Sequence, residues 1–413
     1  MNVLLTIRNN WKKSVFFTGL LGYGASTLKT NIEIRQYMNE FSTEVLQAGQ
    51  DTQGTPQNVL VVMNPIANKK KAENLFKKYC EPILHLAGYS VEVLRTNYIG
   101  HAKAYVEELN KLPDVIVVAG GNGTKSEVVT GLLRRQGSSC PISFIPLGRD
   151  MQPKSSFFSF SKQHELDYVM ELCNSLMPLL KNQSKYESVI QYDVLNEAAN
   201  EEGSASQLKP IFGLNGFSWG LLKELDTKKD KYWYLGPLKH HIAAFLRSFS
   251  GNVDWQMDTD YVYTPPCSGC SNCRVKSDKT APNKGFFLKK LVPAQNGISD
   301  ASHKFIVNDN CSTNMEGSIK SNQINISLNQ NSEHFDELES KFINSLQPGW
   351  EFIKNIPNIT NKTIEPNLIV KSRTIKLYPS ASTPNIFYSI DGEEYEPRPI
   401  KVSIVPNAIK VFC

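Results

Sequence analysis

Small and polar residues follow an apolar run in the first third of the chain, at residues 120–124. A helical pattern begins directly behind them. Glycines let the backbone approach a phosphate closely and turn its amides toward it. The first turn of a helix adds N–H donors and partial positive charge. The segment therefore predicts a site for nucleotide phosphates, made by Gly120, Gly121, Asn122, Gly123 and Thr124.

Three polar residues could add to this chemistry. Thr124 can donate its hydroxyl to a phosphate or cap the helix, and Glu127 lies three residues later, at the spacing of a capping box. Asn122 has nearly the size of an aspartate, but it carries no charge. It therefore cannot act as a base, and it binds Mg²⁺ weakly compared with a carboxylate.

A tight strand-to-helix turn that binds no ligand is the alternative for these glycines. The sequence has no Walker A motif, dinucleotide glycine fingerprint or protein-kinase catalytic loop where this fold would need one. The nucleotide interpretation therefore depends on the turn together with its surroundings.

The elements around the turn alternate between strand and helix. Helical spacing separates four apolar runs, which are typical of strands buried on both faces. This alternation predicts an α/β domain over residues 56–185, with a parallel sheet and helices on both faces. Ligands bind beyond the carboxyl ends of such strands, where Asn64 also lies. The predicted strands are 58–65, 89–96, 114–121 and 141–148.

The pattern changes at about residue 186. Short segments that alternate polar and apolar residues follow, bounded by Pro, Asn, Gly and Ser. Such segments predict an antiparallel β domain over residues 186–413. A polar stretch at about 265–284 predicts a surface insertion within it.

The composition excludes several classes of protein. The chain has 413 residues, 40% hydrophobic and 21% charged, which is typical of a globular protein. A net charge of +5 without a basic stripe predicts no nucleic-acid partner.

The first 50 residues predict targeting or membrane association. Arg8, Lys12 and Lys13 precede the apolar run 15–25, and no acidic residue occurs before Glu33. The run is shorter than the roughly 20 residues that span a bilayer. This pattern favours a mitochondrial targeting segment or an interfacial anchor, with a secretory signal as the alternative.

Three cysteines have C-x₂-C-x₂-C spacing: Cys267, Cys270 and Cys273. Structural zinc usually has four ligands, and no fourth cysteine or histidine follows nearby. A bound metal, a disulfide and a flexible loop all stay open for this segment.

Long motifs in both halves resemble the diacylglycerol kinase and sphingosine kinase catalytic-domain superfamily, and within it the mitochondrial acylglycerol kinases. The matching stretches span nearly the whole chain. Among them are VMNPIANKKKA, DVIVVAGGNGTKSEVVTGLLRR, KYWYLGPLK and SIDGEEYEPRPIKVSIVPNAIKVFC.

The resemblance implies an α/β nucleotide domain joined to a β-sandwich domain, with the active site between them. It implies transfer of the γ-phosphoryl group of ATP, with Mg²⁺, to mono- or diacylglycerol. The implied location is the mitochondrial inner membrane, facing the intermembrane space, and carrier-translocase subunits are implied partners. Nucleotide binding is implied for Asn64, Gly120, Gly121, Gly123, Thr124 and Glu127, and catalysis for Asn122, Asp391 and Glu393, with the proposed general base in the D-G-E of the second domain.

The sequence departs from the family pattern at three places. Asn122 replaces an aspartate, Lys70 stands where relatives carry glycine, and the loop PLGRDMQ at 146–152 differs from the superfamily. These changes favour a second hypothesis beside the working kinase. In it the chain is a catalytically impaired member that serves as a scaffold in the carrier translocase. For Asp391-Gly392, a hairpin turn is the alternative to a catalytic role.

Overall fold

The computed structural model divides into two compact units. Unit 1 comprises Met1–Glu187 and Ile409–Cys413, and unit 2 comprises Ser188–Ala408. The residues described are 11–50, 58–135, 139–148, 163–195, 209–228, 231–232, 242–246, 256–267, 270, 308, 311, 313–329, 336–344, 354–355, 364–380 and 387–413.

Unit 1 contains a parallel sheet in the order β2-β1-β3-β4, and β4 also pairs with the end of β16. The register places Val59 of β1 beside Val115 of β3, and Ile142 of β4 beside Val411 of β16. The strands are β1 (Asn58–Met63), β2 (Ser90–Arg95), β3 (Val115–Gly120), β4 (Ile142–Pro146) and β16 (Ile400–Phe412).

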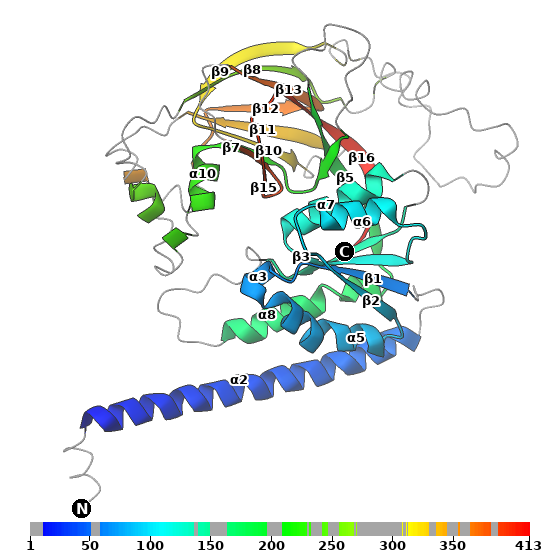
Figure 1. The fold of residues 1–413 in the computed structure, drawn as a ribbon, viewed down its shortest axis with the longest axis vertical. Helices are drawn as coiled ribbons and strands as arrows, with labels where there is room; N and C mark the ends of the chain where they lie inside the picture. Colours follow the sequence, from blue (N-terminus) through cyan, green and yellow to red (C-terminus); the bar gives the residue numbers. More distant parts are fainter. Residues whose placement is uncertain are drawn as a thin grey trace, which may run out of the picture. The chain divides into compact units, whose positions relative to one another are not determined.

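Helices cover both faces of this sheet, as Figure 1 shows. Alternate residues of β1 and β3 form one core with α2, α5 and α8, and α6 and α7 lie on the other side of the sheet. Every residue of β3 is buried, which explains its continuous apolar sequence. The helices are α3 (Ala67–Lys70), α4 (Ala72–Leu75), the π-helix η1 (Phe76–Cys80), α5 (Glu81–Leu86), α6 (His101–Glu108), α7 (Asn122–Arg134), α8 (Gln163–Asn174) and α9 (Met177–Leu180).

A 40-residue helix, α2 (Trp11–Gln50), precedes the sheet. Ile34, Phe41 and Val45 are buried at helical spacing in the core of unit 1. The second half of the helix is therefore part of that core, whereas the first half exposes large apolar side chains, among them Phe16 and Leu21. Among the helices that the structure describes, none is long and apolar enough to cross a membrane.

Unit 2 contains two antiparallel sheets. One has the order β16-β13-β8-β9, with β5 pairing β16 and β6, and the other has the order β12-β11-β10-β7-β14-β15. The helix α10 (Leu221–Lys228) follows β7. The strands are β5 (Ser184–Val194), β6 (Ile211–Gly213), β7 (Phe217–Gly220), β8 (Met257–Thr264), β9 (Met315–Ser321), β10 (Gln323–Asn329), β11 (Glu337–Ile343), β12 (Leu368–Ser372), β13 (Thr374–Pro379), β14 (Tyr388–Ile390) and β15 (Glu393–Tyr395).

One apolar core joins the two sheets of unit 2. Ile375 and Val402 from the first sheet share it with Trp219 and Phe342 from the second. Residues of each strand alternate between this core and the opposite face, which accounts for their alternating sequence. The predicted fold class is therefore confirmed: an α/β unit with a parallel sheet, and an antiparallel β-sandwich.

Candidate functional site

The glycine turn joins β3 to α7. The last residue of β3 is Gly120, and Gly121 is the N-cap of α7 in an extended conformation, with φ −98° and ψ −171°. A glycine cap has no side chain that could accept a hydrogen bond from the first amides of the helix. The N-terminus of α7 therefore offers backbone donors and partial positive charge to an anion.

Close packing explains why glycine is needed in the turn. A Cβ added to Gly120 would lie 2.8 Å from Oγ1 of Thr124, whose side chain is buried over it. A Cβ added to Gly148, just after β4, would lie 2.7 Å from Cα of Gly121. The backbones of the two loops therefore touch. The sequence singled out Gly120 and Gly121 but not Gly148, for which the only signal was the PLG motif after a strand.

Asn122 is the first residue of α7 and is half-buried, as is Gly123 beside it. Its carboxamide brings no negative charge to the helix N-terminus. Lys125, one turn later, holds its ammonium 4.7 Å from the centre of the Phe144 ring in β4. The charged group in the first turn of α7 is therefore a cation. No motif in the sequence pointed to Lys125.

The predicted capping box is wrong. Helix α7 begins at Asn122, so Thr124 lies inside the helix and cannot be its N-cap. Glu127 instead reaches the neighbouring helix α6, where Oε1 accepts from the Gly100 amide at 2.9 Å and Oε2 from the Ala102 amide at 3.0 Å. Both carboxylate oxygens of Glu127 thus cap α6, and they hold α6 against α7.

Asn64 lies beside the glycine turn, at the end of β1. Its amide donates to the carbonyl of Ala119 at 3.2 Å, one residue before Gly120. Its side-chain oxygen accepts from the Ile66 amide at 3.0 Å, which forms a turn. The predicted residues of unit 1 that come together are therefore Asn64, Gly120, Gly121, Asn122, Gly123 and Thr124.

A short chain of hydrogen bonds connects α3 to the end of β4. Asn68 is buried, and its Nδ2 donates to the Tyr168 hydroxyl at 3.4 Å. That hydroxyl donates to the carbonyl of Pro146 at 3.1 Å. Burial raises the pKa of Tyr168 to about 12, so the hydroxyl stays protonated at neutral pH. Sequence analysis did not find this connection, because its members are far apart along the chain.

Lys70 adopts a left-handed backbone conformation with φ 67° and is exposed. This conformation favours glycine, which is the residue that the family resemblance implies at this position. The lysine therefore keeps a backbone shape suited to glycine. The other departing loop, PLGRDMQ, is described only up to Gly148, and the rest lies outside the described residues.

Asp391 and Gly392 form the two-residue turn between β14 and β15. Their φ angles are 50° and 92°, and Ile390 pairs with Glu393 across the turn. Positive φ at both central residues is typical of a tight hairpin. The hairpin alternative considered for this dipeptide is therefore confirmed.

The carboxylate of Asp391 is buried and accepts three backbone hydrogen bonds. Oδ2 accepts from the Leu214 amide at 2.7 Å, and Oδ1 accepts from the amides of Asn215 and Gly216, each at 2.9 Å. A Cβ on Gly213 would lie 2.8 Å from Oδ2, so that glycine makes room for the carboxylate. Asp391 thus fixes the loop between β6 and β7.

Glu393 follows the turn and is half-buried. Its Oε2 accepts a hydrogen bond from the Tyr395 hydroxyl at 2.8 Å. Glu394 is exposed and pairs with Lys223 of α10. Of the two acidic residues in the D-G-E motif, Asp391 is therefore the one whose carboxylate is held by three backbone amides, and Glu393 accepts from a side-chain hydroxyl.

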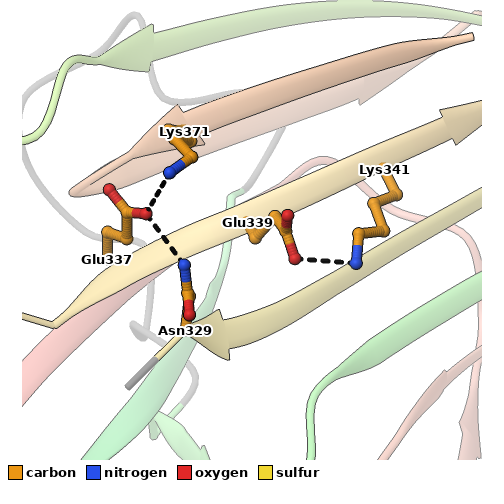
Figure 2. Close-up of polar contacts among 5 residues, drawn as sticks. All are labelled: Asn329, Glu337, Glu339, Lys341 and Lys371. Carbon is orange, nitrogen blue, oxygen red and sulfur yellow. Dashed lines mark hydrogen bonds and ion pairs between the residues drawn. The ribbon is translucent and has the colours of Figure 1, made fainter. Parts of the chain in front are cut away.

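A second acidic cluster lies on the sheet that contains β10, β11 and β12 (Figure 2). Oε1 of Glu337 accepts from Nδ2 of Asn329 at 2.9 Å and from Nζ of Lys371 at 2.7 Å, and Glu339 pairs with Lys341. The bond with Glu337 raises the pKa of Lys371. Each carboxylate has a cation beside it. The contacts of Glu337 join three strands and the Glu339–Lys341 pair lies within β11, so we assign this cluster to stabilisation of the sheet.

Comparisons with known proteins match both halves of the chain. The model of the diacylglycerol kinase catalytic domain matches residues 58–152, and the model of the acylglycerol kinase C-terminal region matches residues 214–413. The human mitochondrial acylglycerol kinase is 29% identical over 99% of this chain and 95% of its own length. The Xenopus laevis mitochondrial acylglycerol kinase is 35% identical over 62% of this chain and 57% of its own length.

The fold is similar to that of a solved bacterial structure. A putative diacylglycerol kinase from Bacillus anthracis superposes with a TM-score of 0.51 at 14% sequence identity, covering 88% of this chain and 97% of that one. Both the sequence and the structural matches therefore extend across the two units.

Proposed function

The chain belongs to the acylglycerol kinase family of lipid kinases, and on this premise we propose that it phosphorylates a free hydroxyl of mono- or diacylglycerol with ATP. The products are lysophosphatidic and phosphatidic acid. The observation that carries the proposal is the turn between β3 and α7, where close packing requires glycine and the N-cap Gly121 leaves the first amides of the helix without a side-chain acceptor. Phosphoryl transfer depends mainly on positioning and charge stabilisation, which such a turn supplies.

In the proposed mechanism, the amides at Gly121–Gly123 hold the ATP phosphates. The hydroxyl oxygen of the lipid attacks the γ-phosphorus, the bond to the bridging oxygen breaks, and ADP leaves. Glu393 accepts the proton of the attacking hydroxyl. The hydrogen bond from Tyr395 orients the Glu393 carboxylate for this step.

Mg²⁺ would neutralise charge on the phosphates. Its ligands are hard oxygens, usually one or two carboxylates together with substrate phosphates. At the glycine turn the chain offers the neutral oxygen of Asn122, and both oxygens of Glu127 already accept backbone hydrogen bonds. In unit 1 the residues thus fit a metal held chiefly by ATP, with Asn122 as a weak ligand.

Asn122 favours a second candidate function. A family member that lacks the motif carboxylate can be a scaffold, as in the carrier-translocase hypothesis, because a structural subunit needs no charge at this position. Loss of one charge-stabilising group commonly costs about 10²-fold in rate. The fold of the turn is unaffected, since asparagine and aspartate are nearly isosteric.

A lipid kinase assay separates the two functions. Purified protein is given monoacylglycerol or diacylglycerol, Mg²⁺ and labelled ATP, and wild type is compared with Asn122→Asp. The kinase proposal predicts turnover well above background in wild type and an increase of about 10-fold or more in the variant. Label transfer only in Asn122→Asp supports the scaffold instead.

We further propose a mitochondrial location, at the inner membrane and facing the intermembrane space. The relatives carry mitochondrial names, and the first half of α2 exposes apolar residues beside Lys12 and Lys13. An exposed apolar face with basic residues suits an anionic lipid surface. Binding to cardiolipin vesicles by wild type, with at least a five-fold loss in Phe16→Ser/Leu21→Ser, is the expected result. Equal binding by the two proteins contradicts it.

A further inference from the structure

Three cysteines meet where a long connection leaves the first sheet of unit 2. Strands β8 and β9 run antiparallel, and their last pair joins Tyr263 to Met315. Cys267 follows the end of β8 by three residues, and Cys311 precedes β9 by four. Because the two strands pair at this end, their flanking cysteines lie close together.

The three sulfur atoms form a compact group. The Sγ atoms of Cys267, Cys270 and Cys311 all lie within 4.8 Å of one another. In tetrahedral zinc sites the Zn–S distance of about 2.3 Å places neighbouring sulfurs about 3.8 Å apart. Shifts of about 1 Å or less would therefore bring these thiolates onto one ion.

The cysteines of this group are shielded from solvent. Cys270 is 0% and Cys311 is 1% exposed, and Cys267 is half-buried. The surrounding backbone is also held in place. The Cys311 amide donates to the carbonyl of Asn308 at 3.2 Å, and the Thr264 hydroxyl donates to Oδ1 of Asn314 at 3.1 Å, which joins the two ends of the connection.

The number of sulfurs favours a metal over a disulfide. All three cysteines are thiols in the structure, and a disulfide would use only two of them. The C-x₂-C spacing of Cys267 and Cys270 is the usual first half of a zinc site, because it directs both sulfurs to one point. Thiolates are soft ligands, so they select zinc rather than magnesium or calcium.

We propose that Cys267, Cys270 and Cys311 bind one Zn²⁺ through three thiolates. Each thiol releases its proton on binding, and a water or another ligand completes the tetrahedron. The ion closes the base of the connection between β8 and β9, which restricts the unfolded chain and stabilises unit 2. Its role is structural, and it is separate from the proposed phosphoryl transfer. Cys273 lies outside the described residues.

Metal content tests the site directly. Full-length protein, purified without added chelator and with Zn²⁺ in the growth medium, is examined by native mass spectrometry and elemental analysis. We expect one zinc per chain in wild type and in Cys413→Ser, whose cysteine is exposed and outside the group. We expect less than about a tenth of that zinc in Cys311→Ser.

Two measurements on wild type keep the proposal falsifiable if Cys311→Ser does not fold. Replacement of the metal by Co²⁺ should give the sulfur-to-metal charge-transfer bands of a tetrahedral thiolate site. A zinc chelator should lower the Tm, and added Zn²⁺ should restore it. Metal-free wild type with three reactive thiols, or a mass lowered by the two hydrogens of a disulfide, overturns the proposal.

Discussion

The turn after β3 in unit 1 and the turn between β14 and β15 in unit 2 differ in what they present to nearby backbone amides. At the first turn the helix N-cap is Gly121, which has no side chain to offer. At the second, the carboxylate of Asp391 accepts from the three successive amides of residues 214–216. In our proposal the first turn binds an anion from outside, whereas the second contains the carboxylate of Asp391.

The comparison also separates the acidic residues by role. Glu127 and Asp391 both accept backbone hydrogen bonds with their two oxygens, so each stabilises a neighbouring loop or helix. Glu393 instead accepts from the Tyr395 side chain, and it is the acid we assign to proton transfer. Asp391 can therefore be structural even though it lies two residues from the acid that we propose for proton transfer.

The largest effect is expected for Asp391→Ala. The substitution leaves three amides without their acceptor, each costing about 1–3 kcal/mol. We expect the free energy of unfolding of unit 2 to fall by about 3 kcal/mol or more in urea denaturation. Asp391→Asn should cost about half as much, because its Oδ1 can still accept while its Nδ2 cannot. An Asp391→Ala protein as stable as wild type contradicts the structural role.

Glu393→Gln should lower kcat by about 10²–10³-fold and change the unfolding free energy little, because glutamine keeps the size of the side chain and an oxygen that can accept from Tyr395 but is not a base. The matched control is Glu394→Gln, the adjacent exposed acid that pairs with Lys223. Steady-state kinetics with acylglycerol should show the control within about two-fold of wild type, because Glu394 is exposed and takes no part in the proposed proton transfer. Similar losses in the two variants would refute the assignment of Glu393.

Gly148→Ala should disturb the first turn without touching the second. The added Cβ would lie 2.7 Å from Cα of Gly121, so the glycine turn must shift. Overpacking of this kind costs about 1–3 kcal/mol, and we expect at least a 10-fold loss of ATP affinity by calorimetry. Gly19→Ala is the control, because nothing lies within 4 Å of its Cβ and alanine favours the helix. Unchanged ATP affinity in Gly148→Ala would argue against a nucleotide site at the turn between β3 and α7.

The smallest effects concern two adjacent lysines. Lys70 has φ 67°, so Lys70→Gly should raise the unfolding free energy by about 0.5–1 kcal/mol. Lys71 has φ −94°, and Lys71→Gly should lower it by a similar amount, since glycine there only adds flexibility to the unfolded chain. Thermal unfolding compares the pair, and the same sign of change in both would contradict the backbone argument.

The sequence predicts the sheets well because periodicity reports local burial. The apolar run of β3 and the alternating strands of unit 2 show that periodicity within a few residues. No such local pattern predicts the hydrogen bonds of Glu127 and Asp391, because the donor amides lie 25–27 and 175–177 residues away. Capping-box spacing suggested a local partner for Glu127, but its carboxylate accepts from two amides of residues 100 and 102 instead.

The same limit applies to the N-terminal helix and to the cysteines. The basic and apolar start predicted a targeting or anchoring segment. The burial of Ile34, Phe41 and Val45, which makes the second half of α2 part of the core, was not predicted. No further ligand follows the C-x₂-C-x₂-C segment nearby in the sequence, but the pairing of β8 with β9 brings Cys311 to Cys267 and Cys270. Strand pairing of this kind cannot be inferred from spacing along the chain.

Hydrogen exchange with and without Mg-ATP tests the contrast between the two turns most directly. We expect the amides of residues 121–124 to exchange fast alone and to be protected at least 10-fold by the nucleotide. The amides of residues 214–216 should exchange slowly in both states, because Asp391 already accepts from them. Unchanged exchange at 121–124 with ATP present would contradict the account.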